Sequence, residues 1–207
     1  MRKARSIVFL SGNGSNFQNI INNIKSGFLH IEILSVVSNN KNAYGLERAK
    51  KEKIKTIMVN SDNDYNNVTE YIITNSVDIV ILAGYMKILP KSFVNKHIGK
   101  ILNIHPSLLP KYKGLNTHSR AIKDKEKYHG ASVHFVTPDL DNGPVIIQGK
   151  VEIKNSDTKD ILEEKIHKIE HEIYPLAIKW LSEKFIKQEN DKCLFNNEVL
   201  TTPIEHI

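Results

Sequence analysis

Short apolar runs recur through the first half of the chain, and segments with apolar residues at helical spacing separate most of them. The runs at 6–10, 31–37, 56–59, 77–83 and 100–104 predict strands, and 17–25, 44–51 and 65–74 predict helices. Strands that alternate with helices are typical of an α/β protein with a mostly parallel sheet and helices on both faces. The run at 77–83 is almost entirely apolar and predicts a central strand.

The pattern changes in the second half of the chain. Residues 117–123 predict a short helix, and 131–136 and 145–153 predict two further strands. The turn at 137–144 gives these two strands the spacing of a hairpin. We therefore expect an antiparallel element on the C-terminal side of the sheet.

A long helix is predicted over 158–181, with Ser156 or Asp157 as its N-cap. Pro175 lies inside this helix and cannot donate to the carbonyl four residues earlier, which predicts a kink. The remainder, 182–207, is polar and predicts a small strand pair followed by a frayed end.

The composition is that of a soluble globular chain. Its 207 residues are 40% hydrophobic, which suits a single domain spanning 1–207. No apolar stretch approaches the roughly 18–20 residues of a membrane span, and the apolar run behind the basic start is too short for a signal peptide. The single cysteine, Cys193, cannot form an internal disulfide. These features predict a cytoplasmic protein without a membrane partner.

The formal net charge is +6, and the lysines are scattered among many asparagines. This pattern favours a solvated surface, with attraction of anionic small molecules as the alternative. No basic stripe is interleaved with aromatic residues, so a nucleic-acid partner is not predicted.

A glycine-rich loop at 11–16 (Ser-Gly-Asn-Gly-Ser-Asn) separates the first strand from the first helix. Free N–H groups at a helix start favour a phosphate, Gly14 lets the backbone approach closely, and Ser15 and Asn16 add donors. A dinucleotide fingerprint would need glycine where Phe17 stands, and a nucleoside-triphosphate loop would need Gly-Lys-Ser/Thr. The loop therefore predicts a site for a single phosphate, with an ordinary turn as the alternative.

Asn103 and His105 stand two apart where an apolar run ends, and they share one face if the run is a strand. An amide beside an imidazole suits a site that stabilises a carbonyl oxygen as it gains negative charge. In open parallel sheets, ligands bind beyond the carboxyl ends of the strands, where the 11–16 loop and 83–86 are also expected. A structural role for a histidine before proline is the alternative.

Asp141 lies in a strong turn sequence, Asp-Asn-Gly, and the turn alone could explain it. A carboxylate near His105 would instead favour the protonated imidazole and make it a general acid.

Other titratable residues carry weaker signals. Glu170 lies on the predicted long helix, where a solvated charge is the ordinary interpretation. His118, His129 and His134 are candidates, and the position of His134 within a strand favours a hydrogen-bonded core role. Residues 167–171 do not have the order of a metalloprotease zinc helix, and no metal is predicted.

Seven segments in this order resemble the phosphoribosylglycinamide formyltransferase family, the folate-dependent enzymes of purine synthesis. The resemblance covers about residues 6–182 and rests on 11–16, 45–49, 82–89, 103–114, 129–136, 140–146 and 170–175. It implies a Rossmann-like formyltransferase fold with a phosphate-binding half at about 1–100, a folate and catalytic half at about 101–182, and a polar tail at 183–207. It also suggests a cis bond between Leu109 and Pro110.

The resemblance implies a role for each candidate residue. Gly14, Ser15 and Asn16 would hold the substrate phosphate, and Glu170 the glycinamide amine. The catalytic trio would be Asn103, His105 and Asp141. The folate pocket would be lined by Met86, Lys87, Ile88, Leu89, Asn103, Thr137, Pro138, Asp139, Leu140 and Asp141.

In the implied reaction, the amine of glycinamide ribonucleotide attacks the formyl carbon of 10-formyltetrahydrofolate, the co-substrate. Asn103 and protonated His105 would stabilise the oxygen of the tetrahedral intermediate, a contribution of about 3–4 kcal/mol per donor. Asp141 would keep His105 charged and order a water that carries the proton. The expected partners are small molecules only, and the chain is expected to be a monomer or homodimer.

This chain departs from the family at three places. It has Asn116 where histidine is common and Lys87 where arginine is common, and its 60–65 segment is short and lacks an arginine. These departures concern the substrate edge and the folate tail.

Three alternatives stay open. Methionyl-tRNA formyltransferase shares the Asn-x-His-Pro and Asp elements, but it carries an RNA-binding domain for which 182–207 is too short. Formyltetrahydrofolate hydrolase usually carries an N-terminal regulatory domain, whereas the first strand here begins by Ser6. A non-catalytic module that binds a phosphate ligand is the third, although the intact trio argues against it.

Overall fold

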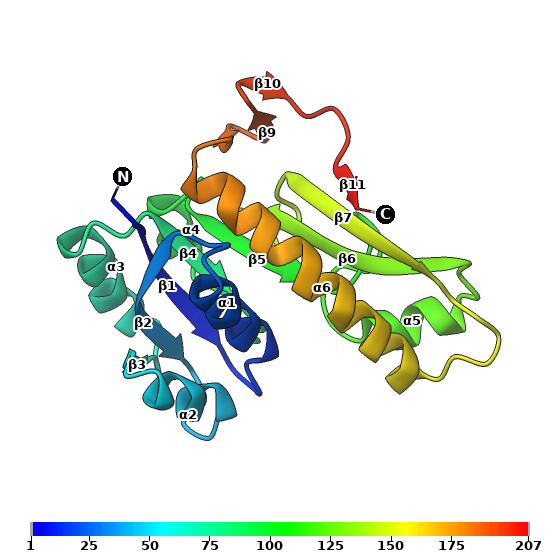
Figure 1. Ribbon diagram of the computed structural model, residues 1–207, viewed down its shortest axis with the longest axis horizontal. Helices are drawn as coiled ribbons and strands as arrows, with labels where there is room; N and C mark the ends of the chain where they lie inside the picture. Colours follow the sequence, from blue (N-terminus) through cyan, green and yellow to red (C-terminus); the bar gives the residue numbers. More distant parts are fainter. Residues whose placement is uncertain (1, 207) are drawn as a thin grey trace.

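The computed structural model describes residues 2–206, and an eight-stranded sheet forms its centre (Figure 1). Seven strands of this sheet are β1 (Ala4–Leu10), β2 (Ile31–Ser38), β3 (Lys55–Met58), β4 (Ile79–Leu82), β5 (Ile101–His105), β6 (Tyr128–Phe135) and β7 (Val145–Glu152). The eighth, β11 (Ile204–His206), lies at one edge, and the order is β11-β7-β6-β5-β4-β1-β2-β3. The strands from β3 to β5 pair in parallel, whereas β6 is antiparallel to both β5 and β7. The predicted mostly parallel sheet with an antiparallel element is confirmed.

Helices cover both faces of the sheet, as the alternation of strands and helices predicted. They are α1 (Ser15–Lys25), α2 (Tyr44–Lys51), α3 (Asp64–Thr74), α4 (Lys91–Lys96), α5 (Thr117–Lys123) and α6 (Lys159–Ser182). Apolar residues of α1, α2 and α6 pack on one face, and those of α3 and α4 pack on the other. Strand β1 serves both cores, because Val8 belongs to the first cluster and Phe9 to the second. The predicted central position of β4 is also confirmed, since it lies between β1 and β5.

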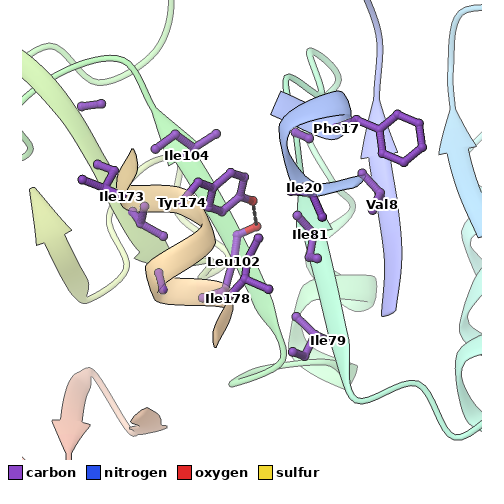
Figure 2. Close-up of a cluster of buried hydrophobic side chains, with 14 of the residues drawn as sticks. Val8, Phe17, Ile20, Ile79, Ile81, Leu102, Ile104, Ile173, Tyr174 and Ile178 are labelled. Carbon is purple, nitrogen blue, oxygen red and sulfur yellow. Dashed lines mark hydrogen bonds between the residues drawn. The ribbon is translucent and has the colours of Figure 1, made fainter. Parts of the chain in front are cut away.

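Helix α6 crosses the face of the sheet beside α1 and packs over β6 and β7 (Figure 1). Its Tyr174 is fully buried, and the hydroxyl donates to the carbonyls of Leu82 (2.9 Å) and Leu102 (3.1 Å). Figure 2 shows the bond to Leu102 among the surrounding apolar side chains. This hydroxyl ties α6 to β4 and β5 next to Asn103.

Helix α6 continues through Pro175, whose missing N–H leaves the carbonyl of His171 without its helical donor. The side-chain amide of Asn19, on α1, donates to that carbonyl at 2.8 Å. The contact satisfies a partly buried carbonyl and joins the two helices. The kink expected at Pro175 stays a prediction.

Two sequence-based expectations are wrong in detail, and one helix was missed. The N-cap of α6 is Thr158, whose side chain accepts from the N–H of Ile161, and not Ser156 or Asp157. Helix α4 was not predicted, because it has only six residues and follows Pro90. The tail is not a strand pair with a frayed end: β8 (Ile186–Glu189), β9 (Lys192–Phe195) and β10 (Glu198–Val199) form a second sheet, and β11 joins the main sheet beside β7. Position 207 lies outside the described residues.

Candidate active site

The carboxyl ends of β1, β4 and β5 lie side by side, because these strands are parallel neighbours. The glycine-rich loop follows β1, the segment from Ala83 follows β4, and His105 ends β5. Ser11 connects the first two of these: its N–H donates to the carbonyl of Gly84 (3.0 Å), and its hydroxyl accepts from the N–H of Met86 (2.8 Å). The sequence-predicted elements therefore meet at one edge of the sheet, as the topology required.

The glycine-rich loop is packed closely against α2 where it leads into α1. Gly14 precedes α1 in a left-handed conformation (φ +75°), and a Cβ there would lie 2.9 Å from the Cα of Gly45. The first N–H groups of α1 have no acceptor within the helix. Arg48 adds positive charge and holds the loop, because its guanidinium donates to the carbonyl (2.9 Å) and the side-chain oxygen (2.8 Å) of Asn13.

Asn16 and Glu170 form a buried pair between α1 and α6. The amide of Asn16 donates to Oε2 of Glu170 at 2.9 Å, and Glu170 is only 5% exposed. Burial raises the pKa of Glu170, and the hydrogen bond from Asn16 opposes this shift. The Asn16 side chain thus has an acceptor already, so its backbone N–H and the donors of Ser15 are the groups most free for a phosphate.

Asn103, His105 and Asp141 belong to one cluster of side chains, in which His134 links Asn103 to the other two. Nδ1 of His105 lies 3.4 Å from Oδ2 of Asp141, and Asn103 reaches the same carboxylate through His134. Nε2 of His134 lies 3.1 Å from the Asn103 amide nitrogen and 3.7 Å from Oδ1 of Asp141. The side chains of His105 and Asp141 are both buried.

His134 has one defined tautomer. Its Nδ1 lies 2.8 Å from the carbonyl of Phe135, which can only accept, so Nδ1 carries the hydrogen. Burial lowers the pKa of His134, which therefore stays neutral near pH 7. Its Nε2 accepts from the Asn103 amide, and this orients the amide with a second hydrogen available for another acceptor.

Both ring nitrogens of His105 have partners. Nε2 lies 2.9 Å from the carbonyl of Tyr112 and must donate to it, so Nδ1 is the nitrogen that faces Asp141. The carboxylate of Asp141 is held in turn by the N–H of Gly114 at 2.9 Å. With Nε2 protonated, the protonated ring is the form that can also donate to Asp141.

Apart from Asn103 on β5, the residues predicted for the folate pocket lie on two loops that approach each other. The side chain of Lys91, just after the 86–89 segment, lies 3.6 Å from Asp139 of the 137–141 segment. Met86 (67%) and Ile88 (69%) are unusually exposed apolar residues, and Leu140 is also exposed, whereas Leu89 is buried in the second core cluster. Lys87 binds Asp62 at 3.1 Å. The remaining members of the second loop, Thr137 and Pro138, are half-buried.

Within residues 2–206 the side chains form no group of three or more His, Cys, Asp or Glu that could hold a metal ion. In the same range, no helix has the length and apolar character needed to cross a membrane. The cis bond expected between Leu109 and Pro110 is present.

Sequence reasoning missed three contributors to the site. His134 was placed in the core, and it does fill that role, but it also orients Asn103. The only sequence signal for this second role was that His134 lies on a predicted strand. The register that pairs Asn103 with His134 could not be read from the sequence. Arg48 and Tyr112 lie within the resemblance segments 45–49 and 103–114, but no role was predicted for either, because their contacts depend on which loop lies beside them.

Comparison with known proteins gives matches in both sequence and structure. The Formyl transferase family model matches residues 4–178. The phosphoribosylglycinamide formyltransferases of Haemophilus influenzae and Escherichia coli are 41% and 40% identical to this chain, over 93% and 94% of it and 94% of each relative. The structure of phosphoribosylglycinamide formyltransferase from Coxiella burnetii aligns with a TM-score of 0.93 at 39% identity, covering 99% of this chain and 100% of that one.

Proposed function

The chain belongs to the formyl transferase family, and we propose that it transfers a formyl group from 10-formyltetrahydrofolate to the amine of glycinamide ribonucleotide in purine synthesis. The names of the relatives, at about 40% identity over nearly the full chain, support this substrate. The observation that carries the chemistry is the convergence of Asn103, His105 and Asp141 at the strand ends beside the glycine-rich loop. We place this activity in the cytoplasm, on one domain, in a monomer or homodimer.

The nucleotide binds at the start of α1. Its phosphate is held by the N–H groups of Gly14, Ser15 and Asn16 and by the Ser15 hydroxyl, with the charge of Arg48 behind the loop. Glu170 binds the glycinamide portion and is positioned by Asn16. Among residues 2–206 this buried carboxylate forms no salt bridge, which suits a polar substrate group bearing hydrogen-bond donors.

The formyl folate binds between the 86–89 and 137–141 segments. Met86, Ile88 and Leu140 offer exposed apolar surface to the flat ring system, and Lys87 adds a positive charge near the acidic tail. Leu89 anchors the first segment in the core, while Thr137, Pro138 and Asp139 shape the second. This arrangement presents the formyl group beside Asn103 and Asp141.

The reaction is an acyl transfer without a protein nucleophile. The amine lone pair forms a C–N bond to the formyl carbon, and the carbonyl π electrons move to oxygen. The Asn103 amide and the charged His105 ring stabilise that oxygen. When the intermediate collapses, the bond from carbon to the folate nitrogen breaks, and the proton lost by the amine reaches that nitrogen through a water ordered by Asp141.

One assay tests this proposal. Purified protein is incubated with 10-formyltetrahydrofolate and with the glycinamide amine, either with or without its 5′-phosphate. We expect folate release that depends on the amine and a much lower KM for the phosphorylated amine. Folate release without any amine would indicate the hydrolase instead, and binding of both ligands without turnover would indicate a non-catalytic module.

A further inference from the structure

Tyr112 has an unusual backbone conformation for a bulky residue. Its φ is +57°, in the left-handed region that non-glycine residues rarely occupy. Bulky side chains occupy this region at an energetic cost. The loop that contains it follows directly from His105 and reaches Gly114, which also has a positive φ (+78°). A conformation of this kind persists only when surrounding contacts hold it.

The side chain of Tyr112 supplies those contacts. Its hydroxyl donates to Oδ2 of Asp124 (2.9 Å) and approaches Oε1 of Glu126 (3.1 Å), both in the turn that follows α5. Its ring lies under the guanidinium of Arg120, 5.0 Å from the ring centroid. Burial and the two carboxylates raise the pKa of the Tyr112 phenol, so the hydroxyl remains a donor at neutral pH.

The backbone that is held in this way contacts both members of the His–Asp pair. The carbonyl of Tyr112 accepts from Nε2 of His105 at 2.9 Å, and two residues later the N–H of Gly114 donates to Asp141 at 2.9 Å. The loop therefore fixes the imidazole from one side and the carboxylate from the other. Because a carbonyl only accepts, it removes Nε2 from the chemistry and leaves Nδ1 as the nitrogen that Asp141 and a reacting oxygen can share.

We propose that Tyr112 is a positioning residue: its hydroxyl, anchored on Asp124 and Glu126, keeps the backbone left-handed so that its carbonyl fixes His105 with Nδ1 as the working nitrogen. This inference rests on the proposed function for its effect on turnover. The hydrogen-bond arrangement of the His105 ring follows from the geometry alone and can be tested separately.

The first test replaces the hydroxyl only. Tyr112→Phe keeps the ring over Arg120 and removes both anchors, and Tyr128→Phe, on the partly exposed β6 end, is the matched control. We expect Tyr112→Phe to lower kcat by about five- to tenfold, as the loss of one net hydrogen bond would, with KM for both substrates unchanged. Tyr128→Phe should leave both constants unchanged.

The second readout is NMR of protein labelled with 15N in its histidine rings, with the His105 signals assigned by their loss in His105→Asn. In the wild-type protein, the Nε2 hydrogen should be protected from exchange with water. In Tyr112→Phe this protection should fall. The proposal is overturned if the His105 signals are unchanged, or if they change while kcat stays that of the control.

A pair of truncations separates the backbone role from the side-chain role. Tyr112→Gly and Tyr112→Ala both lose the anchor, but only glycine adopts φ +57° without strain. We expect the glycine variant to keep more of the His105 Nε2 protection than the alanine variant; equal protection in the two would contradict the proposal. If wild-type protein transfers no formyl group, the proposed function fails, while these ring signals still decide the positioning role.

Discussion

The Asn16 amide donates to the Glu170 carboxylate at 2.9 Å across 154 positions of sequence. The contact joins α1, which starts at the glycine-rich loop, to α6, which crosses the sheet. The Asn16 amide is one hydrogen-bond donor to the Glu170 carboxylate. The side-chain oxygen of Asn16 is itself buried and has no hydrogen-bond partner among the described residues. A buried carboxyl with so few donors costs folding energy when it is charged, so we expect the charged form of Glu170 to lower the stability of the fold.

Replacing this carboxylate should stabilise the protein at neutral pH. Because burial raises the pKa of Glu170 in the folded state, its contribution to stability is fully present below the unfolded pKa of about 4.3 and is lost as pH rises through the folded pKa. Glu170→Gln removes the loss of stability that occurs when this carboxyl ionises. The free energy of unfolding of the variant should therefore exceed that of wild type at pH 7.5, and the difference should shrink as pH falls towards 5. Urea unfolding of both proteins at these pH values measures it.

The exposed Glu164, on the same helix, provides the control. Glu164→Gln should leave stability within about 0.5 kcal/mol of wild type at both pH values. A Glu170→Gln protein less stable than wild type at pH 7.5 would contradict the assignment. The same variant should raise KM for the nucleotide.

Buried histidines should make the protein sensitive to mild acid. Burial lowers the pKa of His97 and of His129 to about 4, from the usual value near 6.5. A depressed histidine pKa contributes stability that is present above pH 6.5 and lost as pH falls towards 4. The expected loss is up to about 1.4 kcal/mol per pH unit for each histidine that stays unprotonated only in the folded state.

His97 offers a test away from the candidate site, because it bonds Thr69 at 3.2 Å and packs on Phe93. Urea unfolding of wild type and His97→Asn between pH 7.5 and 5 should show a shallower pH dependence in the variant. Identical slopes would mean that His97 does not contribute to the acid sensitivity.

The glycine-rich loop should not tolerate a side chain at position 14. Gly14→Ala forces an alanine into the left-handed conformation, which costs roughly 1–2 kcal/mol. It also places the alanine Cβ 2.9 Å from the Cα of Gly45. Gly27 has a similar φ (+82°) but open space around it, so Gly27→Ala measures the conformational cost alone. We expect Gly14→Ala to unfold at lower urea than Gly27→Ala and to raise KM for the nucleotide more than for the folate. Equal increases in the KM for the nucleotide and the KM for the folate would contradict a role of the loop in phosphate binding.

Asp141→Asn should cut turnover while preserving the fold. The asparagine oxygen can still accept from the N–H of Gly114, but the charge beside His105 is lost. We expect kcat to fall by about 100-fold or more, the range of a general acid–base contribution, with an unfolding midpoint close to that of wild type. Asp191→Asn, in the exposed turn between β8 and β9, should have no effect on kcat. Near-normal turnover in Asp141→Asn would exclude the proton-relay role.

The sequence alone determined the α/β class, the strands of the parallel half and the antiparallel hairpin. These followed from local patterns: continuous apolar runs for strands, apolar residues at helical spacing for helices, and turn residues between them. It also predicted which strand ends carry the candidate site residues, because parallel topology brings the ends after Leu10, Leu82 and His105 to one edge. The recognisable motifs around Asn103 and Asp141 gave the family.

Only the tertiary structure decided how those groups are oriented. The β5–β6 register sets His134 against Asn103, a buried donor joins Asn16 to Glu170, and a left-handed tyrosine holds the ring of His105. Tertiary contacts also replaced the expected frayed end with β11, paired to β7. Local sequence sets backbone preferences within a few residues. The direction of a hydrogen bond between segments far apart depends on the packing of the whole sheet, and no local pattern records it.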